Sequence, residues 1–163
     1  MSDKSFLREQ IHKGFSDDPW HGPSTLSLLE DLTAREAAAY AVPGGHSVWE
    51  IVLHMISWHN EVRRRLSGNA PAMPEEGDWP RVGKVSEAAW RRDLERLEAS
   101  LTELLDTLDG LNEKDLDRIG GGLSDRDPAL GTGVTLRAMI NGLVQHNAYH
   151  SGQIALLRKA LEA

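Results

Sequence analysis

The sequence predicts an all-α protein, a bundle of four main helices, and three observations support this prediction. Apolar residues recur at steps of three and four along several segments, which is the spacing of one helix face. No segment alternates apolar and polar residues for long enough to form a pair of strands. The 163 residues match the usual size of one domain, so residues 1–163 are expected to share a single core.

The N-terminal part is predicted to hold short helices. Residues 5–15 and 24–32 have helical patterns, and two prolines lie between them. Thr33 and Glu36 have the three-residue offset of a capping box, which predicts a further short turn to about Tyr40.

Residues 46–66 are predicted to form the second main helix. Ser47 and Glu50 form a capping box at its start, directly after a Gly-Gly pair. Ser67 and Gly68 supply the signal for its C-terminal end.

The two remaining main helices are predicted over residues 87–109 and 134–161. Ser86 is suited to cap the first of them, and Gly110 is expected to end it in the left-handed conformation. The connections 68–84 and 111–133 are long for a bundle, so they are expected to carry function or to cross it.

The overall composition excludes several functions. Lys and Arg number 18 against 25 Asp and Glu, a net charge of −7 that disfavours nucleic acid and anionic membranes as partners. With no cysteine, the chain has neither a disulfide nor a catalytic thiol, so thiol chemistry would need an external thiol. No apolar run is long enough for a membrane span or a signal peptide, and we therefore expect a soluble, cytoplasmic protein.

The most informative pattern is a pair of histidines, His146 and His150. Residues four apart share a helix face, and this face also carries the apolar residues of the last helix. A shared cation would satisfy two inward-facing imidazoles, and a third ligand should come from another helix. The helix pattern leaves His54 and His59 both open, because His59 lies on the apolar face and His54 at its flank. Glu50 is a possible fourth ligand, although its capping role is favoured.

Other residues have simpler interpretations. His12 and His46 are expected to be solvated, whereas His21 is expected either at the surface or beside the site. Trp58 and Trp90 are more readily explained as packing residues than as platforms for a cofactor.

Three stretches together resemble the DinB/YfiT-like superfamily, in its DinB-like branch: residues 20–24, 43–58 and 145–158, the last with the pattern H-x-x-x-H-x-G-Q-I. The resemblance implies a four-helix bundle of up-down-down-up type. It also implies a divalent metal, zinc or nickel, held by His54, His146 and His150, and a homodimer. Some relatives are S-transferases or isomerases that use low-molecular-weight thiols.

Such a triad would leave one coordination position open, where a water would have a pKa near about 7. No convincing general base is found among the four carboxylates considered, which are Glu50, Glu61, Asp125 and Asp127. Tyr149 and Gln153 flank the histidine pair. Ordinary packing and hydrogen bonding is the preferred interpretation of these two residues, and the other is that they orient a ligand.

Two classes of function follow. The first is a metal-dependent enzyme acting on an unidentified small molecule, either a hydrolase or a transferase that activates an external thiol. The alternative is a non-catalytic, metal-stabilised binding protein related to stress. Trp49 and Leu53 lie away from the main apolar face of helix 46–66, which predicts a dimer through a second buried surface.

Overall fold

The computed structural model describes residues 1–120 and 133–162, and this part of the chain is helical. It contains no strand, only an isolated bridge between Ile119 and Thr135. The helices are α1 (Asp3–Ser16), α2 (Thr25–Leu29), α3 (Ala34–Ala37), α4 (Val48–Leu66), α5 (Glu87–Asp109), the 3-10 helix η1 (Glu113–Asp117) and α6 (Leu136–Leu161). The all-α prediction is therefore confirmed for the described residues.

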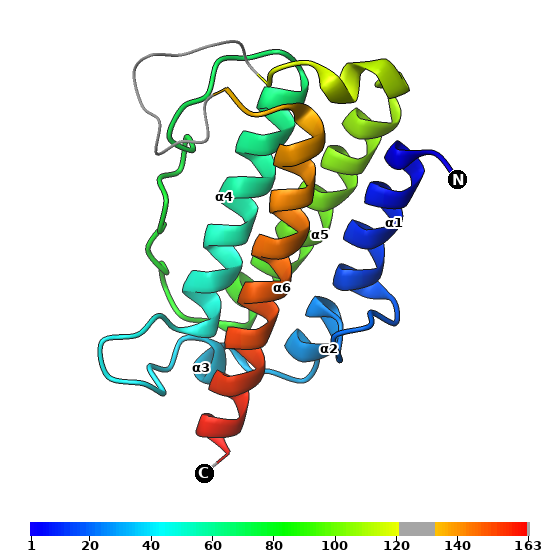
Figure 1. Ribbon diagram of the computed structural model, residues 1–163. Helices are drawn as coiled ribbons and strands as arrows, with labels where there is room; N and C mark the ends of the chain where they lie inside the picture. Colours follow the sequence, from blue (N-terminus) through cyan, green and yellow to red (C-terminus); the bar gives the residue numbers. More distant parts are fainter. Residues whose placement is uncertain (121–132, 163) are drawn as a thin grey trace.

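The four long helices α1, α4, α5 and α6 lie side by side (Figure 1). Helix α4 contacts α5 and α6, and α1 contacts the same two helices, so the contacts close into a ring. Their apolar faces meet in one core whose fully buried residues include Val52, Leu97, Leu104, Ile140 and Ile154. The short helices α2 and α3 lie near the end of the bundle where α6 terminates (Figure 1).

Capping side chains begin the helices where the sequence predicted them. Both halves of the capping box are present at Ser47 and Glu50 before α4, and also at Thr33 and Glu36 before α3. At the start of α5, the Ser86 side chain accepts the Ala89 amide. These local hydrogen bonds replace helix partners that the first amides lack.

The two predicted C-terminal glycines behave differently. Gly68 has a φ of 92°, and the amides of Gly68 and Asn69 donate back to the carbonyls of Arg65 and Arg64 at 2.9 and 3.2 Å. This is the left-handed ending that favours glycine. The same prediction for Gly110 is wrong: its φ is −69°, because its amide and that of Leu111 still donate to helix carbonyls, at Asp106 and Leu108, in a right-handed turn.

Other helix boundaries also differ from the prediction. The helix predicted over 24–32 ends at Leu29, because Asp31 takes a φ of 64° that a helix cannot contain. Helix η1 lies in a connection that was predicted without regular structure. In the described part of the chain, no helix is both long and apolar enough to cross a membrane.

Trp49 and Leu53, which suggested a second buried surface, are covered within the chain itself. They are 1% and 4% exposed. The Trp49 indole donates to Asp93 of α5 at 2.9 Å, and its ring lies 5.1 Å from that of Trp90. This surface of α4 is therefore filled by α5 and gives no support for a dimer.

Candidate metal centre

Helices α4 and α6 bring three imidazoles together: His54, His146 and His150, called the triad below. The Nε2 atom of His146 lies 3.0 Å from Nε2 of His54 and 3.1 Å from Nε2 of His150. One ring nitrogen from each of the three residues lies within 4.8 Å of the other two. The pair on α6 meets because residues four apart share a helix face, and α4 packs against that face.

The outer nitrogens of two triad rings are held by hydrogen bonds. Nδ1 of His54 donates to the backbone carbonyl of Asp78 at 2.6 Å, and Nδ1 of His150 donates to Oε1 of Gln153 at 2.7 Å. A neutral imidazole with its proton on Nδ1 has a free lone pair on Nε2. Both rings therefore present an acceptor nitrogen to the centre of the triad.

These residues fit a divalent transition metal. Imidazole nitrogens bind zinc at about 2.0–2.1 Å, so two ligands of a tetrahedral ion lie about 3.3–3.4 Å apart, close to the distances in the triad. Facing lone pairs repel one another unless a proton or a cation lies between them. Within the described chain, no other group of three or more His, Asp or Glu side chains converges in this way.

The surroundings keep the triad neutral, which a metal ligand requires. Burial lowers the pKa of His146 to about 3, with a further contribution from the neighbouring imidazoles. Burial also lowers the pKa of His150 to about 4 and that of His54 below its usual value. Proton competition for the metal is therefore expected only well below the pH of about 6.5 at which a free imidazole titrates.

The loop between α4 and α5 (residues 67–86) covers His54. The Trp79 ring stacks on His54 with the centroids 3.9 Å apart, and on its other side it stacks on His46 at 3.5 Å. The Asp78 carboxylate accepts the Trp58 indole N–H at 2.8 Å and lies 3.3 Å from Nδ1 of His54. Sequence reasoning missed Asp78 and Trp79, and the only signal was the unusual length of this connection.

His59 does not join the triad. It is fully buried, and its Nδ1 shares a hydrogen bond with the Ser100 hydroxyl at 3.0 Å. Its Nε2 donates to Oδ1 of Asn147 at 3.2 Å. Both ring nitrogens are thus used inside the core, and burial lowers the pKa of His59 to about 4.

The carboxylates considered as a general base have other roles. Glu50 caps α4 and accepts the Tyr40 hydroxyl at 2.9 Å, so its capping interpretation holds. Glu61 is buried and accepts hydrogen bonds from Arg64, Arg65 and the Ala72 amide. Asp125 and Asp127 lie outside the described residues.

Further predicted residues lie as follows. Gln153 holds His150 and also donates to the hydroxyl of Tyr149, an exposed residue whose ring lies 5.2 Å from that of His150.

His12 and His46 are exposed, as predicted. His21 is exposed too, and with Trp20 it borders a separate cavity between α1 and α6. The Trp90 indole is buried and donates to the Leu32 carbonyl.

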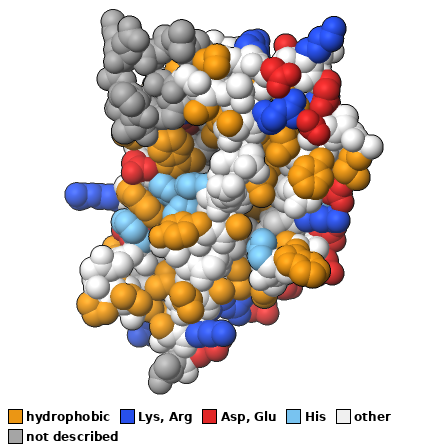
Figure 2. Space-filling model, in the orientation of Figure 1, with side chains coloured by type: hydrophobic (Ala, Val, Ile, Leu, Met, Phe, Trp, Pro, Cys, Tyr) orange, Lys and Arg blue, Asp and Glu red, His pale blue; other side chains and the backbone are white. Residues whose placement is uncertain are grey.

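Histidine side chains gather on the face of the molecule over α4 and α6, with hydrophobic side chains beside them (Figure 2). His54 and His150 are buried, whereas His146 is only partly buried. The triad therefore lies just beneath this surface.

Comparison with known proteins identifies the family. No curated protein and no solved structure is significantly similar to the chain. A family model described as the DinB superfamily matches residues 20–154, a range that contains all three triad histidines and the loop that covers His54. The match spans most of the chain, and the chain therefore belongs to the DinB superfamily.

Proposed function

We propose that the protein is a metal-dependent enzyme whose divalent ion, zinc or nickel, is held by His54, His146 and His150. The observation that carries the proposal is the convergence of three Nε2 atoms with no fourth His, Asp or Glu in the group among the described residues. Structural zinc sites are normally closed by four protein ligands, whereas catalytic sites use three and keep a position open.

The residues around the triad prepare it for this role. The Asp78 carbonyl and Gln153 hold two ring protons on Nδ1, so the Nε2 atoms are available without a change of tautomer. Trp79 shields one face of His54 from water. A divalent ion bound there supplies Lewis acidity, which lowers the pKa of a water or thiol and polarises a carbonyl group.

The reaction class follows from this chemistry. Three neutral ligands leave the charge of the ion uncompensated, which favours hydrolysis or the activation of a thiol. The chain has no cysteine, so a transferase of this kind would use an external low-molecular-weight thiol and a small-molecule substrate.

One observation favours the alternative, a non-catalytic metal-stabilised binding protein related to stress. The triad joins α4 to α6, and two of its three rings are buried. A cation held there would fasten the two helices together even without a reaction.

We also propose that the long helices follow the up-down-down-up order that the family resemblance implies. The α4–α5 loop supports this order, because it runs back along the outside of α4 before α5 begins (Figure 1). A connection of this kind lets α4 and α5 point in the same direction.

Elemental analysis of protein without a polyhistidine tag tests the proposal. We expect one zinc or nickel ion per chain in the wild type and in His12→Ala, and none in His146→Ala or His150→Ala. X-ray absorption of the loaded protein should show three nitrogen ligands with one or more light atoms from solvent. A closed set of four protein ligands would favour the non-catalytic alternative. A wild type that neither contains nor takes up zinc or nickel would refute both.

A further inference from the structure

The α4–α5 loop brings a carboxylate beside the triad. Oδ1 of Asp78 lies 3.3 Å from Nδ1 of His54, and the backbone carbonyl of the same residue accepts the proton on that nitrogen. The group of converging ligand atoms contains the three histidines but not Asp78. The carboxylate therefore lies at the outer edge of the His54 ring, away from the Nε2 atom that meets the rest of the triad.

A tryptophan on α4 holds this carboxylate in place. The indole N–H of Trp58 donates to the same Oδ1 of Asp78 at 2.8 Å. Trp58 follows His54 by four residues, so the two partners of the carboxylate lie on one face of the helix. The guanidinium of the buried Arg65 lies over the Trp58 ring, 5.8 Å from its centre. Oδ1 therefore has a fixed position, although the Asp78 side chain is 45% exposed.

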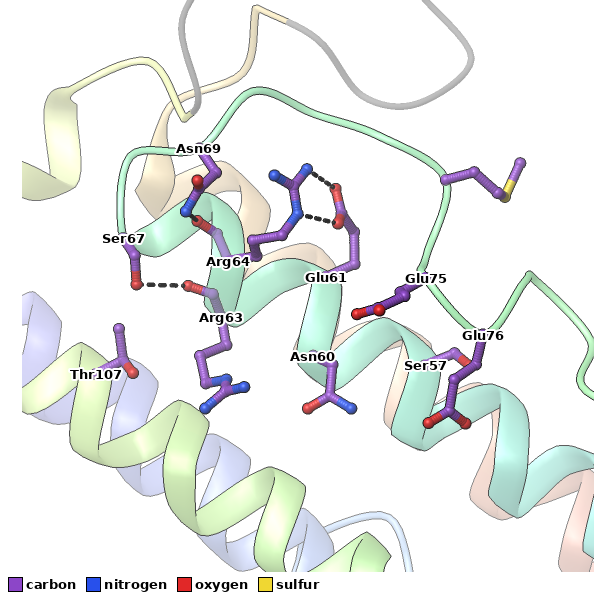
Figure 3. A pocket seen from close by; sticks show the side chains of 11 residues that line it. Ser57, Asn60, Glu61, Arg63, Arg64, Ser67, Asn69, Glu75, Glu76 and Thr107 are labelled. Carbon is purple, nitrogen blue, oxygen red and sulfur yellow. Dashed lines mark hydrogen bonds and ion pairs between the residues drawn. The ribbon is translucent and has the colours of Figure 1, made fainter.

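The loop is also attached to α4 before it reaches Asp78. Glu61 on α4 accepts the Ala72 amide at 2.8 Å. Its carboxylate is held in turn by Arg64 of the same helix, as Figure 3 shows. Two side chains of α4, Glu61 and Trp58, thus set the path of the loop beside the triad.

The charge of Asp78 has no cationic side chain to neutralise it. In the described part of the chain, no Lys or Arg forms an ion pair with Asp78, and the His54 imidazole is its only partner of this kind. Three neutral imidazoles leave the double charge of a bound ion uncompensated. A negative charge beside one of these rings is therefore favourable when the ion is bound.

We propose that Asp78 is a positioning residue of the metal site, whose carboxylate, held by Trp58, strengthens His54 as a ligand. A carboxylate near the Nδ1 proton makes the Nε2 atom of the same ring more basic, as the outer partners of metal-bound histidines do. It also supplies a negative charge that none of the three ligands carries. This role rests on the proposed metal site.

Zinc titration of the metal-free, full-length protein against a chelating indicator at pH 7 tests the role of Asp78. Asp78→Asn removes the charge but keeps the backbone carbonyl and a side-chain oxygen for the Trp58 N–H. We expect its zinc affinity to be about tenfold lower than that of the wild type, because loss of such a partner costs about 10- to 100-fold and this one is partly exposed. The matched control is Glu75→Gln, which removes an exposed charge from the same loop and should leave the affinity unchanged.

Two further measurements on metal-free Asp78→Asn separate this role from a structural one. Its melting temperature should equal that of the wild type. Nitrogen-15 magnetic resonance of the imidazoles should still show the His54 proton on Nδ1, because the carbonyl that accepts this proton is unchanged. A lower affinity accompanied by a lower melting temperature or by loss of this tautomer would show that Asp78 only supports the fold, and would overturn the proposal.

A double-mutant cycle tests the part played by Trp58. Trp58→Phe keeps an aromatic ring but removes the N–H, so the carboxylate is free to turn away from His54. Asp78→Asn should therefore lower the zinc affinity by a smaller factor in the Trp58→Phe background than in the wild type. Equal factors in the two backgrounds would overturn the claim that Trp58 holds the carboxylate.

Failure of this proposal is distinguishable from failure of the metal site. Tight zinc binding by the wild type, with equal affinity in Asp78→Asn, would overturn the role of Asp78 and leave the proposed function intact. A wild type that binds neither zinc nor nickel would overturn both.

Discussion

Two histidines on α4 have different roles because different residues surround their imidazole rings. His54 and His59 are five residues apart, which turns them about 140° from each other around the helix axis. His54 faces α6 and the α4–α5 loop, where its Nε2 meets the other triad rings. His59 faces Ser100 and Asn147, so its ring nitrogens are already satisfied.

His59 should make the fold sensitive to acid. Burial lowers its pKa from 6.5 to about 4, so the unfolded chain binds a proton more readily than the folded one between these values. Its contribution is fully present above pH 6.5 and is lost as the pH falls toward 4. The loss is about 3 kcal/mol of unfolding free energy.

Urea unfolding of His59→Gln at pH 7 and pH 4.5 tests this prediction. The variant should be less stable at pH 7, because a packed ring is lost. Between pH 7 and pH 4.5, however, its unfolding free energy should fall by about 2 kcal/mol less than that of the wild type. His12→Gln, which changes an exposed imidazole, should keep the wild-type dependence. An equal acid loss in His59→Gln and the wild type would show that another group is responsible.

At the scale of elements, the α4–α5 loop acts on the triad through its backbone. The Asp78 carbonyl fixes the tautomer of His54, and Trp79 fixes the plane of its ring. Directly before them, Gly77 has a φ of 87° and its amide donates to the Pro74 carbonyl at 2.9 Å. This turn sets where the Asp78 carbonyl points.

Gly77→Ala should therefore weaken metal binding. A side chain at positive φ strains the turn by about 1–2 kcal/mol, although no atom lies within 4 Å of the added Cβ. Loss of the partner that orients a ligating imidazole lowers metal affinity by about 10- to 100-fold. Competition with a chelating indicator measures the affinity. The matched control is Gly83→Ala in the same loop, which also meets open space but without positive φ; equal affinities of both variants would contradict the prediction.

Glu61 anchors the start of the same loop. Its side chain is 1% exposed and accepts the Ala72 amide at 2.8 Å, in addition to its arginine partners on α4. Breaking a buried ion pair costs about 3–5 kcal/mol, whereas an exposed pair contributes at most about 1 kcal/mol. Glu61→Ala should therefore lower the unfolding free energy by several kcal/mol.

The control for Glu61 is Glu103→Ala, because Glu103 is 52% exposed and pairs with Arg63. Urea denaturation should show a change of at most about 1 kcal/mol for this variant. Similar losses of unfolding free energy in both variants would contradict the prediction that burial makes the Glu61 ion pairs more stabilising than the exposed one.

At the scale of the whole molecule, the chain is predicted to form a dimer. The face of α4 that first suggested it is covered by α5, but Tyr149 and Leu156 are 65% and 70% exposed. They are seven residues apart on α6 and so share one side of the helix. Exposed apolar groups of this kind are typical of an interface.

Sedimentation velocity at tens of micromolar should show a dimer for the wild type. Leu156→Lys should shift the protein toward the monomer, while Val85→Lys, a similar change at an exposed loop residue, should not. A wild type that sediments strictly as a monomer would rule the dimer out.

The sequence alone determined the long helices and two of the three triad histidines. Apolar periodicity and capping residues are local signals, and they located the four long helices to within about two residues. The spacing of His146 and His150 is local as well, because an i, i+4 pair shares a helix face in any fold. Gly110 shows the limit even of local signals, since it stays in the right-handed region and its amide continues the hydrogen bonds of the helix.

The family resemblance pointed to His54 as the third residue, and only the tertiary structure showed what surrounds it and why His59 is excluded. Helical periodicity shows which side of α4 a residue occupies, but not which helix or loop covers that side. It therefore could not choose between His54 and His59 as the third metal ligand. Asp78 and Trp79 lie on a loop without periodicity. They contact His54 although they follow it by 24 and 25 residues in the chain. Such contacts depend on the path of the α4–α5 loop across the packed helices, which no short stretch of sequence encodes.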